Sequence, residues 1–148
     1  MRILVINGPN INFVGIREPE IYGHNDYDSL RQMIMKKAAQ DDILVEIFQS
    51  NHEGVIIDKL QECYHDRPDG IVINPGTLSH YSYALHDALK NLPDVLKVEV
   101  HLSDIMSREE WRKILVTAPA CNHLIYGMGA EGYLEAMDYL KQYAQKDK

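Results

Sequence analysis

Short apolar runs alternate with amphipathic stretches along the whole sequence, and this alternation is the feature that most restricts the fold. The apolar runs have the length of strands and lie at 3–6, 43–48, 70–73, 95–100 and 123–126. Between them, apolar residues recur at helical spacing within 30–37, 55–60, 83–92 and 133–140. Several runs are apolar on both faces, which is typical of a parallel sheet covered by helices. We therefore predict an α/β fold, a flavodoxin-like three-layer sandwich with a five-stranded parallel sheet.

The length of the chain limits how this pattern can be divided into domains. A chain of 148 residues has the size of one domain. The sequence contains no internal repeat, low-complexity tract or interdomain linker, so we expect 1–148 to form a single domain. Ligands bind beyond the carboxyl ends of parallel strands, near the point where the strand order reverses. Functional residues are therefore expected within 7–22, 74–80 and 101–112.

The charge balance and the cysteines restrict the partners. Acidic residues outnumber basic residues by 22 to 15, for a net charge of −7. We expect no nucleic-acid or membrane partner, because no broad positive field would attract them. The first apolar run is too short for a signal-peptide core, and no stretch approaches membrane-spanning length. Cys63 and Cys121 have no CxxC partner, so we expect free thiols and a cytoplasmic location.

The segment 8–25, between the first strand and the first helix, is longer than the usual connection of a few residues. It mixes stiff and hinge-like residues, namely Gly8, Pro9, Gly15, Pro19 and Gly23. Such a segment suits an active-site lid. The alternative is a surface loop without a function.

Tyr22 and Arg17 lie in this lid segment. A tyrosine has a pKa near about 10, so it is a poor base at neutral pH unless a nearby cation lowers that pKa. Lowering the pKa from about 10 to about 7 would require roughly 4 kcal/mol of preferential stabilisation of the tyrosinate. One arginine in a poorly hydrated site could supply much of this stabilisation. The alternative for Tyr22 is an aromatic residue packed in a turn.

Polar residues occupy alternate positions of the fourth predicted strand. Lys97, Glu99 and His101 share one face, and a polar face on an inner strand is costly unless its groups are paired. Glu99 can accept a hydrogen bond from one ring nitrogen of His101 and leave the other at the strand end. This arrangement predicts an oriented general acid. Glu99 should also keep Lys97 charged and poorly nucleophilic. A salt-linked strand at a subunit interface is the alternative.

Other histidines and arginines follow the strands. His80, in NPGTLSH, is a candidate substrate contact, whereas His86 is expected to be solvated or interfacial. Arg108 and Arg112 are four residues apart, which would place both on one side of a helix. Arg112 could clamp a carboxylate, although the two intervening glutamates could neutralise the pair instead. No HxH, HExxH or CxxC spacing is present, so we expect no metal.

Several sequence blocks resemble type II dehydroquinases, from residue 2 to about residue 140. The blocks are ILVINGPNIN, GIREPEIYG, QSNHEG, INPGTLSHYSYALHDAL, VEVHLSD and SREEWR, and their spacing also fits. The resemblance implies a flavodoxin-like enzyme without a cofactor, assembled as a dodecamer of four trimers. It further implies conversion of 3-dehydroquinate into 3-dehydroshikimate and water, in the shikimate pathway or in quinate breakdown.

The resemblance also implies a role for each matched residue. Tyr22 would remove a proton from C2, and Arg17 would stabilise both the tyrosinate and the enolate. Asn10 would hold a water that supports the enolate oxygen. His101, oriented by Glu99, would protonate the departing C1 hydroxyl. The implied substrate-binding residues are Asn74, His80, Arg112, the backbone groups of Leu102 and Ser103, and Asp87, which would reach the site of a neighbouring subunit.

The chain departs from the family pattern around the matched residues. Tyr81, Tyr83 and His86 stand where smaller or basic residues are common, Asp104 stands where Asn is usual, and KILVTAP replaces a His-rich segment. These departures affect the expected subunit contacts, substrate affinity and placement of Arg112. The alternative function is therefore a non-catalytic oligomeric relative that binds a polyhydroxy carboxylate.

Flavin-binding modules and phospho-receivers use the same type of sandwich, so the fold alone does not identify the function. A flavin module requires a hydroxyl-rich and glycine-rich phosphate loop after the first strand, where this chain has NGPNIN. A receiver requires an aspartate at the end of the third strand, where this chain has Asn74. Both classes are therefore disfavoured.

Overall fold

A parallel sheet forms the centre of the molecule. The computed structural model describes residues 1–16, 20 and 26–144. Within them, five strands pair in the order β2-β1-β3-β4-β5, and every pair is parallel. The strands are β1 (Arg2–Asn7), β2 (Leu44–Gln49), β3 (Gly70–Asn74), β4 (Leu96–His101) and β5 (His123–Tyr126). Each overlaps one of the predicted apolar runs, and the predicted flavodoxin-like sandwich is confirmed.

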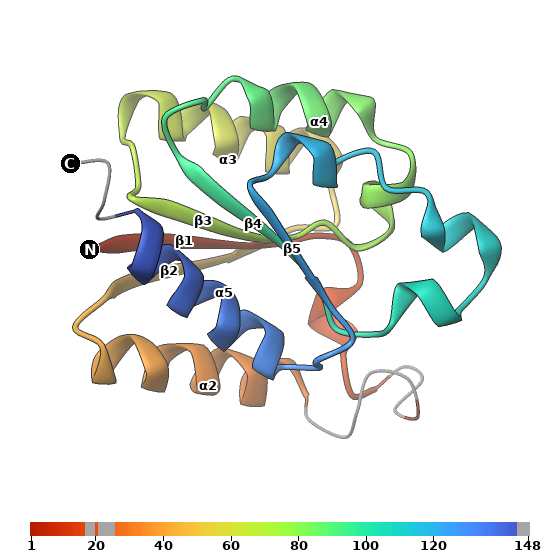
Figure 1. The fold of residues 1–148 in the computed structure, drawn as a ribbon, viewed down its shortest axis with the longest axis horizontal. Helices are drawn as coiled ribbons and strands as arrows, with labels where there is room; N and C mark the ends of the chain where they lie inside the picture. Colours follow the sequence, from red (N-terminus) through yellow and green to blue (C-terminus); the bar gives the residue numbers. More distant parts are fainter. Residues whose placement is uncertain (17–19, 21–25, 145–148) are drawn as a thin grey trace.

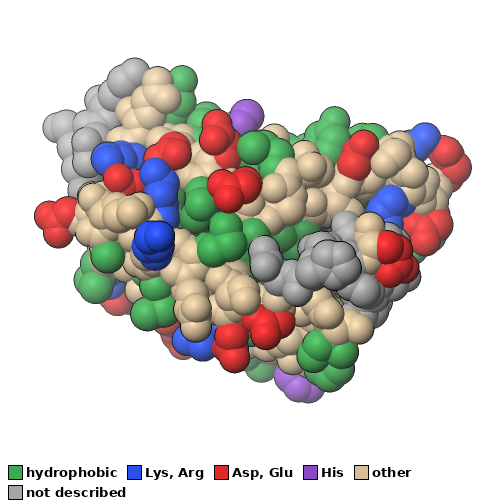
Figure 2. Space-filling view, turned by 90° about the horizontal axis from the view of Figure 1, so that it is seen from below, with side chains coloured by type: hydrophobic (Ala, Val, Ile, Leu, Met, Phe, Trp, Pro, Cys, Tyr) green, Lys and Arg blue, Asp and Glu red, His purple; other side chains and the backbone are tan. Residues whose placement is uncertain are grey.

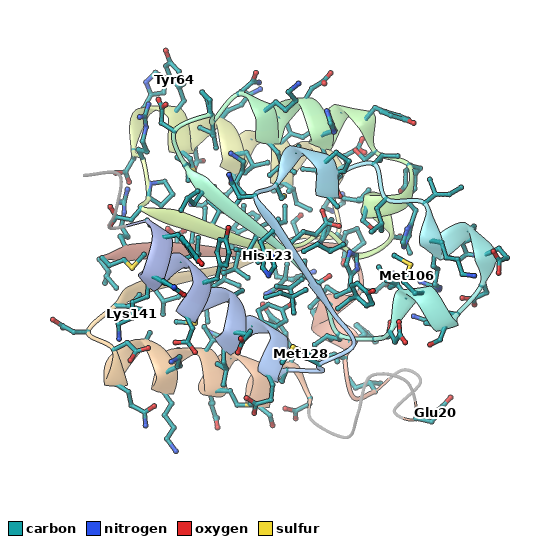
Figure 3. All side chains as sticks on the ribbon, in the orientation of Figure 1. Glu20, Tyr64, Met106, His123, Met128 and Lys141 are labelled. Carbon is teal, nitrogen blue, oxygen red and sulfur yellow. The ribbon has the colours of Figure 1, made fainter. Side chains whose placement is uncertain are left out.

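Helices cover both faces of this sheet (Figure 1). One face carries α2 (Tyr27–Gln40) and α5 (Glu131–Tyr143), and the other carries α3 (Glu53–His65) and α4 (Tyr83–Lys90). Successive side chains of a strand point to opposite faces. In β1, Ile3 and Val5 accordingly belong to one hydrophobic cluster, whereas Leu4 and Ile6 belong to the other. Side chains fill the space between the sheet and both helical layers (Figure 3).

Short polar side chains begin two of the helices. Asp26 accepts a hydrogen bond from the backbone N–H of Ser29 at the start of α2, and Ser82 accepts one from Leu85 at the start of α4. Each cap satisfies a backbone donor that has no partner within its helix. The second cap fixes where α4 begins, just after the end of β3 and its following turn.

The loops after β1 and β3 meet at the point where the strand order reverses. The Gly8 N–H donates to the carbonyl of Asn74 at 2.8 Å. A Cβ on Gly8 would lie 2.4 Å from the oxygen of Pro75, and a Cβ on Gly76 would lie 2.8 Å from the oxygen of Pro9. Gly76 also has a φ of 60°, a conformation that glycine adopts readily. We call Gly8, Pro9, Pro75 and Gly76 the backbone junction, because only main chain fits between its two sides.

The connection between β4 and β5 is built from short 3-10 helices rather than a long α-helix. They are η3 (Ile105–Ser107), η4 (Glu110–Lys113) and η5 (Ala118–Ala120). Arg108 has an extended backbone after η3, whereas Arg112 lies in η4. The prediction that both arginines lie on one side of a single helix is therefore wrong.

The surface carries charges of both signs, and the two cysteines are not bonded to each other. Acidic and basic side chains lie side by side on the face seen in Figure 2. Lys37 of α2, for example, is ion-paired with Asp41 and with Asp138 of α5. No helix in the described part of the chain is long and apolar enough to cross a membrane. Cys63 and Cys121 are free, as predicted.

Candidate active site

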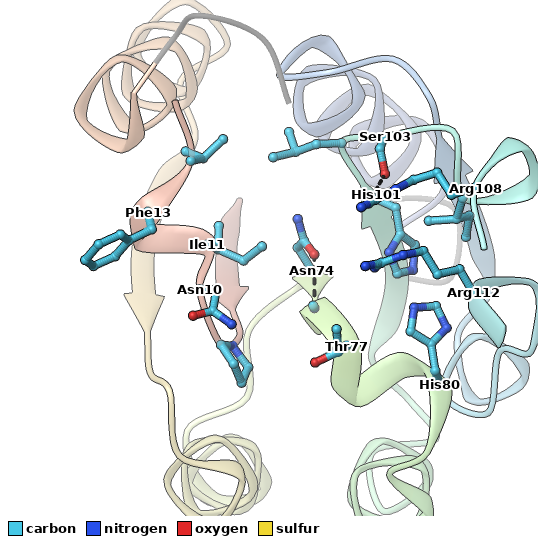
Figure 4. A pocket seen from close by; sticks show the side chains of 15 residues that line it. Asn10, Ile11, Phe13, Asn74, Thr77, His80, His101, Ser103, Arg108 and Arg112 are labelled. Carbon is cyan, nitrogen blue, oxygen red and sulfur yellow. Dashed lines mark hydrogen bonds between the residues drawn. The ribbon is translucent and has the colours of Figure 1, made fainter. Parts of the chain in front are cut away.

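A pocket opens at the carboxyl ends of β1, β3 and β4 (Figure 4). The loop after β1 forms one wall, the end of β3 forms the floor, and the end of β4 with the segment after it forms the other wall. The described residues that line it are Pro9, Asn10, Ile11, Phe13, Val14, Asn74, Gly76, Thr77, His80, His101, Leu102, Ser103, Ile105, Arg108 and Arg112. This is the edge of the sheet at which the parallel topology predicts a ligand site.

His101 ends β4 on the second wall and is 5% exposed. Its Nε2 lies 2.8 Å from Oε1 of Glu99, which is fully buried. Because an ionised carboxylate only accepts hydrogen bonds, Nε2 is the donor in this pair. Nδ1 is then the ring nitrogen that remains for chemistry. The pair has the geometry of a histidine oriented by a carboxylate.

The second carboxylate oxygen of Glu99 has its own partner. The Thr117 hydroxyl donates to Oε2 at 2.7 Å, and both side chains are fully buried. Thr117 was not among the candidate residues of the sequence. The sequence indicates such a residue only indirectly, because a carboxylate buried on an inner strand needs hydrogen-bond donors on both oxygens.

Lys97 shares the face of β4 with these groups but is bound elsewhere. Its ammonium donates to the carbonyls of Leu92 at 2.6 Å and Val95 at 2.8 Å. The expectation that Glu99 keeps Lys97 charged is wrong, because the oxygens of Glu99 are bonded to His101 and Thr117. Burial lowers the pKa of Lys97 below its ordinary value. Lys97 also does not line the pocket.

Asn74 forms the floor of the pocket at the end of β3 and is held on both ends of its amide. Its Nδ2 donates to the Tyr133 hydroxyl at 2.9 Å, and its Oδ1 accepts from the Gly76 N–H at 3.2 Å. Tyr133 in turn donates to Oδ1 of Asn7 at 2.6 Å. Burial raises the pKa of the Tyr133 hydroxyl, which therefore stays protonated. An amide nitrogen has two hydrogens, so Asn74 retains the capacity to donate to a ligand.

His80 lies beside His101, with 6.1 Å between the ring centroids. Its Nδ1 lies 2.8 Å from the carbonyl of Ile114, and a carbonyl only accepts, so Nδ1 carries the proton. Burial lowers the pKa of His80, and the charges of His101 and Arg112 lower it further, against the bond to Ile114. In the neutral ring Nε2 is then an acceptor. His80 is therefore suited to accept a hydrogen bond from a ligand hydroxyl.

His86 fixes the segment that carries the second wall. Its Nδ1 lies 2.7 Å from the carbonyl of Val116, and the Val116 N–H donates to the carbonyl of Ser79 at 2.7 Å. The expectation of a solvated or interfacial His86 therefore missed its main contact. His80 and His86 together hold the residues around Val116 against the start of α4.

Two guanidinium groups face the pocket from this wall (Figure 4). Arg112 is buried, with its Nε 2.5 Å from Glu109 and its guanidinium 4.1 Å from the centroid of the Trp111 ring. Arg108 donates to the Ser103 hydroxyl at 3.2 Å. Glu109 is ion-paired with both arginines. Two guanidinium charges against one carboxylate leave a local positive charge, which suits an anion such as a carboxylate in a chain with a net charge of −7.

The remaining candidate residues lie on the first wall, away from the pocket, or outside the described residues. Asn10 lies on the opposite wall, with a left-handed backbone and its N–H donating to Asn51. Asp87 lies on the exposed face of α4 and is not among the pocket residues. Arg17 and Tyr22 lie outside the described residues, as do 17–19 and 21–25 of the expected lid. In the described ranges, no group of three or more His, Cys, Asp or Glu side chains could hold a metal ion.

Known proteins share both this sequence and this architecture. The family model for dehydroquinase class II matches residues 1–141. A Lachnospira eligens protein named 3-dehydroquinate dehydratase is 55% identical over 146 residues, which cover 99% of each chain. The crystal structure of type II dehydroquinase from Butyrivibrio crossotus has a TM-score of 0.94 at 55% identity, covering 95% of this chain and 97% of the other. The type II dehydroquinase from Propionibacterium acnes has a TM-score of 0.89 at 36% identity, covering 97% and 96%. The chain therefore belongs to the dehydroquinase class II family.

Proposed function

We propose that this chain is a hydro-lyase that converts 3-dehydroquinate into 3-dehydroshikimate and water, with Tyr22 as the base and His101 as the acid. Family membership supports the overall reaction. The observation that carries the mechanism is the buried bond between His101 and Glu99 at the wall of the pocket. It provides an oriented proton donor at the site where a substrate would bind.

The proposed reaction consists of two proton transfers. The ketone of the substrate acidifies C2, so the Tyr22 phenolate takes a proton from C2 and the electron pair forms an enolate. Arg17 and a water held by Asn10 stabilise the negative charge on the enolate oxygen. The enolate then reforms the ketone, the electron pair forms the C1–C2 double bond, and the C1–O bond breaks. His101 protonates the departing hydroxyl, which leaves as water.

Binding in this pocket would use two kinds of contact. The guanidinium groups of Arg112 and Arg108 suit the substrate carboxylate. Asn74 as a donor and His80 as an acceptor suit the substrate hydroxyls. Leu102 and Ser103 complete the wall with backbone groups. Holding the substrate in place beside the acid and the base would then supply part of the rate enhancement.

The direct test is incubation of the purified protein with 3-dehydroquinate while the ultraviolet absorbance of the conjugated product is followed. We expect the absorbance to rise in proportion to the amount of protein. A protein that binds the substrate in calorimetry but yields no product would instead be the non-catalytic binder of a polyhydroxy carboxylate.

An unrelated class of dehydratases acts on the same substrate by forming an imine with a reactive lysine. Lys97 is unsuited to this chemistry because it precedes His101 by four residues, about 13 Å at 3.3 Å per strand residue. Its ammonium also donates to Leu92 and Val95 at that end of the strand.

We expect Lys97→Met to retain near-normal turnover and to unfold more easily, because two buried carbonyls lose their donor. Borohydride added together with substrate should leave the activity of the unaltered protein intact. Turnover assays and denaturation curves give both readouts. Inactivation that requires substrate, with a stable adduct on Lys97, would reverse the assignment.

We further propose that the chain assembles as a homo-oligomer, a dodecamer of four trimers, in which Asp87 reaches the pocket of a neighbouring subunit. Large apolar side chains are exposed around η2 (Gly76–His80), the start of α4 and η4, with Tyr81 at 63%, Tyr83 at 69% and Ile114 at 60%. Such a concentration of exposed apolar side chains marks an interaction surface. Asp87 lies on the same helix as Tyr83.

Sedimentation at micromolar concentration should therefore show a closed assembly much heavier than the 17.0 kDa chain. Replacing both Tyr81 and Tyr83 with aspartate should weaken it, because each change would bury a charge in the interface. A species that sediments only as a monomer would contradict the assembly and remove the proposed role of Asp87.

A further inference from the structure

The carboxylate of Glu99 is fully buried and is held from two sides. Its Oε1 is bonded to His101 at 2.8 Å and its Oε2 to the Thr117 hydroxyl at 2.7 Å. Glu99 and Thr117 both have no exposed surface, and His101 has 5%. Solvent is therefore not positioned to replace either bond, and each partner that is removed leaves a buried oxygen without a donor.

The second bond determines which way the carboxylate plane faces. The terminal torsion of a glutamate is broad, so one hydrogen bond leaves the plane of the carboxylate free to turn. A second donor on the opposite oxygen restricts that rotation. The ring of His101 follows the plane, because its Nε2–H must point at Oε1.

Thr117 is itself held in place by the backbone around it. Its carbonyl accepts from the Ala120 N–H at 2.9 Å as η5 begins, and Pro119 stiffens that turn. The preceding residue, Val116, is bonded to both Ser79 and His86. The β-branched side chain of threonine adds a restricted χ1. The hydroxyl therefore reaches Glu99 from an anchored segment rather than from a free loop.

We propose that Thr117 is a positioning residue for the dehydration, which fixes the Glu99 carboxylate and thereby holds His101 in its proton-donating orientation. This role rests on the proposed function. Thr117 does not line the pocket, so its effect on substrate reaches the reacting atoms only through Glu99 and His101.

The test compares Thr117→Val, which removes the hydroxyl at nearly constant shape, with Thr117→Ser, which keeps it. We expect Thr117→Val to lower kcat by about 10- to 100-fold, as a small misplacement of a catalytic group does, with KM nearly unchanged. Thr117→Ser should restore most of kcat. Ser79→Ala is the matched control, because Ser79 has a buried hydroxyl without a partner in the described residues, and its kcat should stay unchanged.

A role in stability alone predicts a different pattern. Thr117→Val would then unfold more easily while its folded fraction kept the original kcat, and that result would overturn the proposal. A rise in KM at constant kcat would overturn it as well. In a His101→Ala background, Thr117→Val should have no further effect on kcat, since the coupled groups act as one unit.

Two further measurements keep the test decisive. If Thr117→Val does not fold, Thr117→Cys, whose thiol is a weak donor, must give a kcat between those of the serine variant and His101→Ala. If the unaltered protein does not turn over 3-dehydroquinate, the proposed function fails by itself. In that case, nitrogen NMR of the His101 ring still reports whether the ring keeps its orientation toward Glu99. Its Nε2–H signal should exchange faster in the valine variant, and an unchanged signal would exclude positioning by Thr117.

Discussion

Replacing His101 with alanine should lower kcat by about 10²- to 10⁴-fold, the range supplied by a positioned general acid. The change removes the proposed proton donor at the pocket wall, whereas neither hydrophobic cluster includes His101. The fold should therefore persist. Ultraviolet turnover assays give kcat and KM, and circular dichroism verifies the fold.

Two variants serve as controls for this loss. His101→Asn keeps a group able to bond to Glu99 but carries no titratable proton at pH 7, so it should be as inactive as the alanine variant. Glu99→Gln should be milder, because the donor stays and only its orientation is weakened. Near-normal turnover by His101→Ala would refute the acid assignment while leaving the family membership intact.

Tyr22→Phe should abolish measurable turnover, because phenylalanine cannot carry the proton taken from C2. The base is the proposed start of the reaction, and a chain without it forms no enolate. The comparison with Lys97→Met separates the two mechanisms in one assay, since that variant should remain active. An active Tyr22→Phe protein would refute the tyrosinate mechanism.

Arg17→Ala should lose turnover nearly as severely, and its residual activity carries the more specific information. The cation is proposed to favour tyrosinate, so its removal raises the pKa of the base. The limb of the pH–rate profile that reports deprotonation of the base should therefore move to higher pH. A limb that stays in place would show that another group lowers that pKa.

The sequence predicts the layers of this fold because burial dictates its pattern. Strands covered on both faces are continuous apolar runs, as in β1 and β3, whose side chains supply both hydrophobic clusters. The period of two also predicts that Glu99 and His101 share a face, and the structure places them 2.8 Å apart. These predictions depend on local spacing alone.

Contacts between distant segments follow from no local pattern. Thr117 reaches Glu99 from a segment of short 3-10 helices that has no apolar period. Tyr133 bonds to Asn7 across 126 positions of the chain. The spacing of Arg108 and Arg112 indicates an α-helix, but the backbone is extended at Arg108. The segment is held by tertiary contacts such as Val116 with Ser79, and contacts of this kind commonly override local helix propensity.

The backbone junction makes one side of the pocket resistant to substitution, whereas the other side can accept substitutions that change its shape. Gly8 and Gly76 bring two segments of the main chain into contact, and a Cβ at either position would collide with the backbone of Pro75 or Pro9, so a larger side chain at either glycine would disturb the spacing between Asn10 and Asn74. The second wall, formed after β4 by residues 103–112, is a series of short turns with side chains that differ in length and charge. Selection for a substrate of another size would therefore act on the second wall. The spacing between Asn10 and Asn74 would stay constant and would limit which ligands fit.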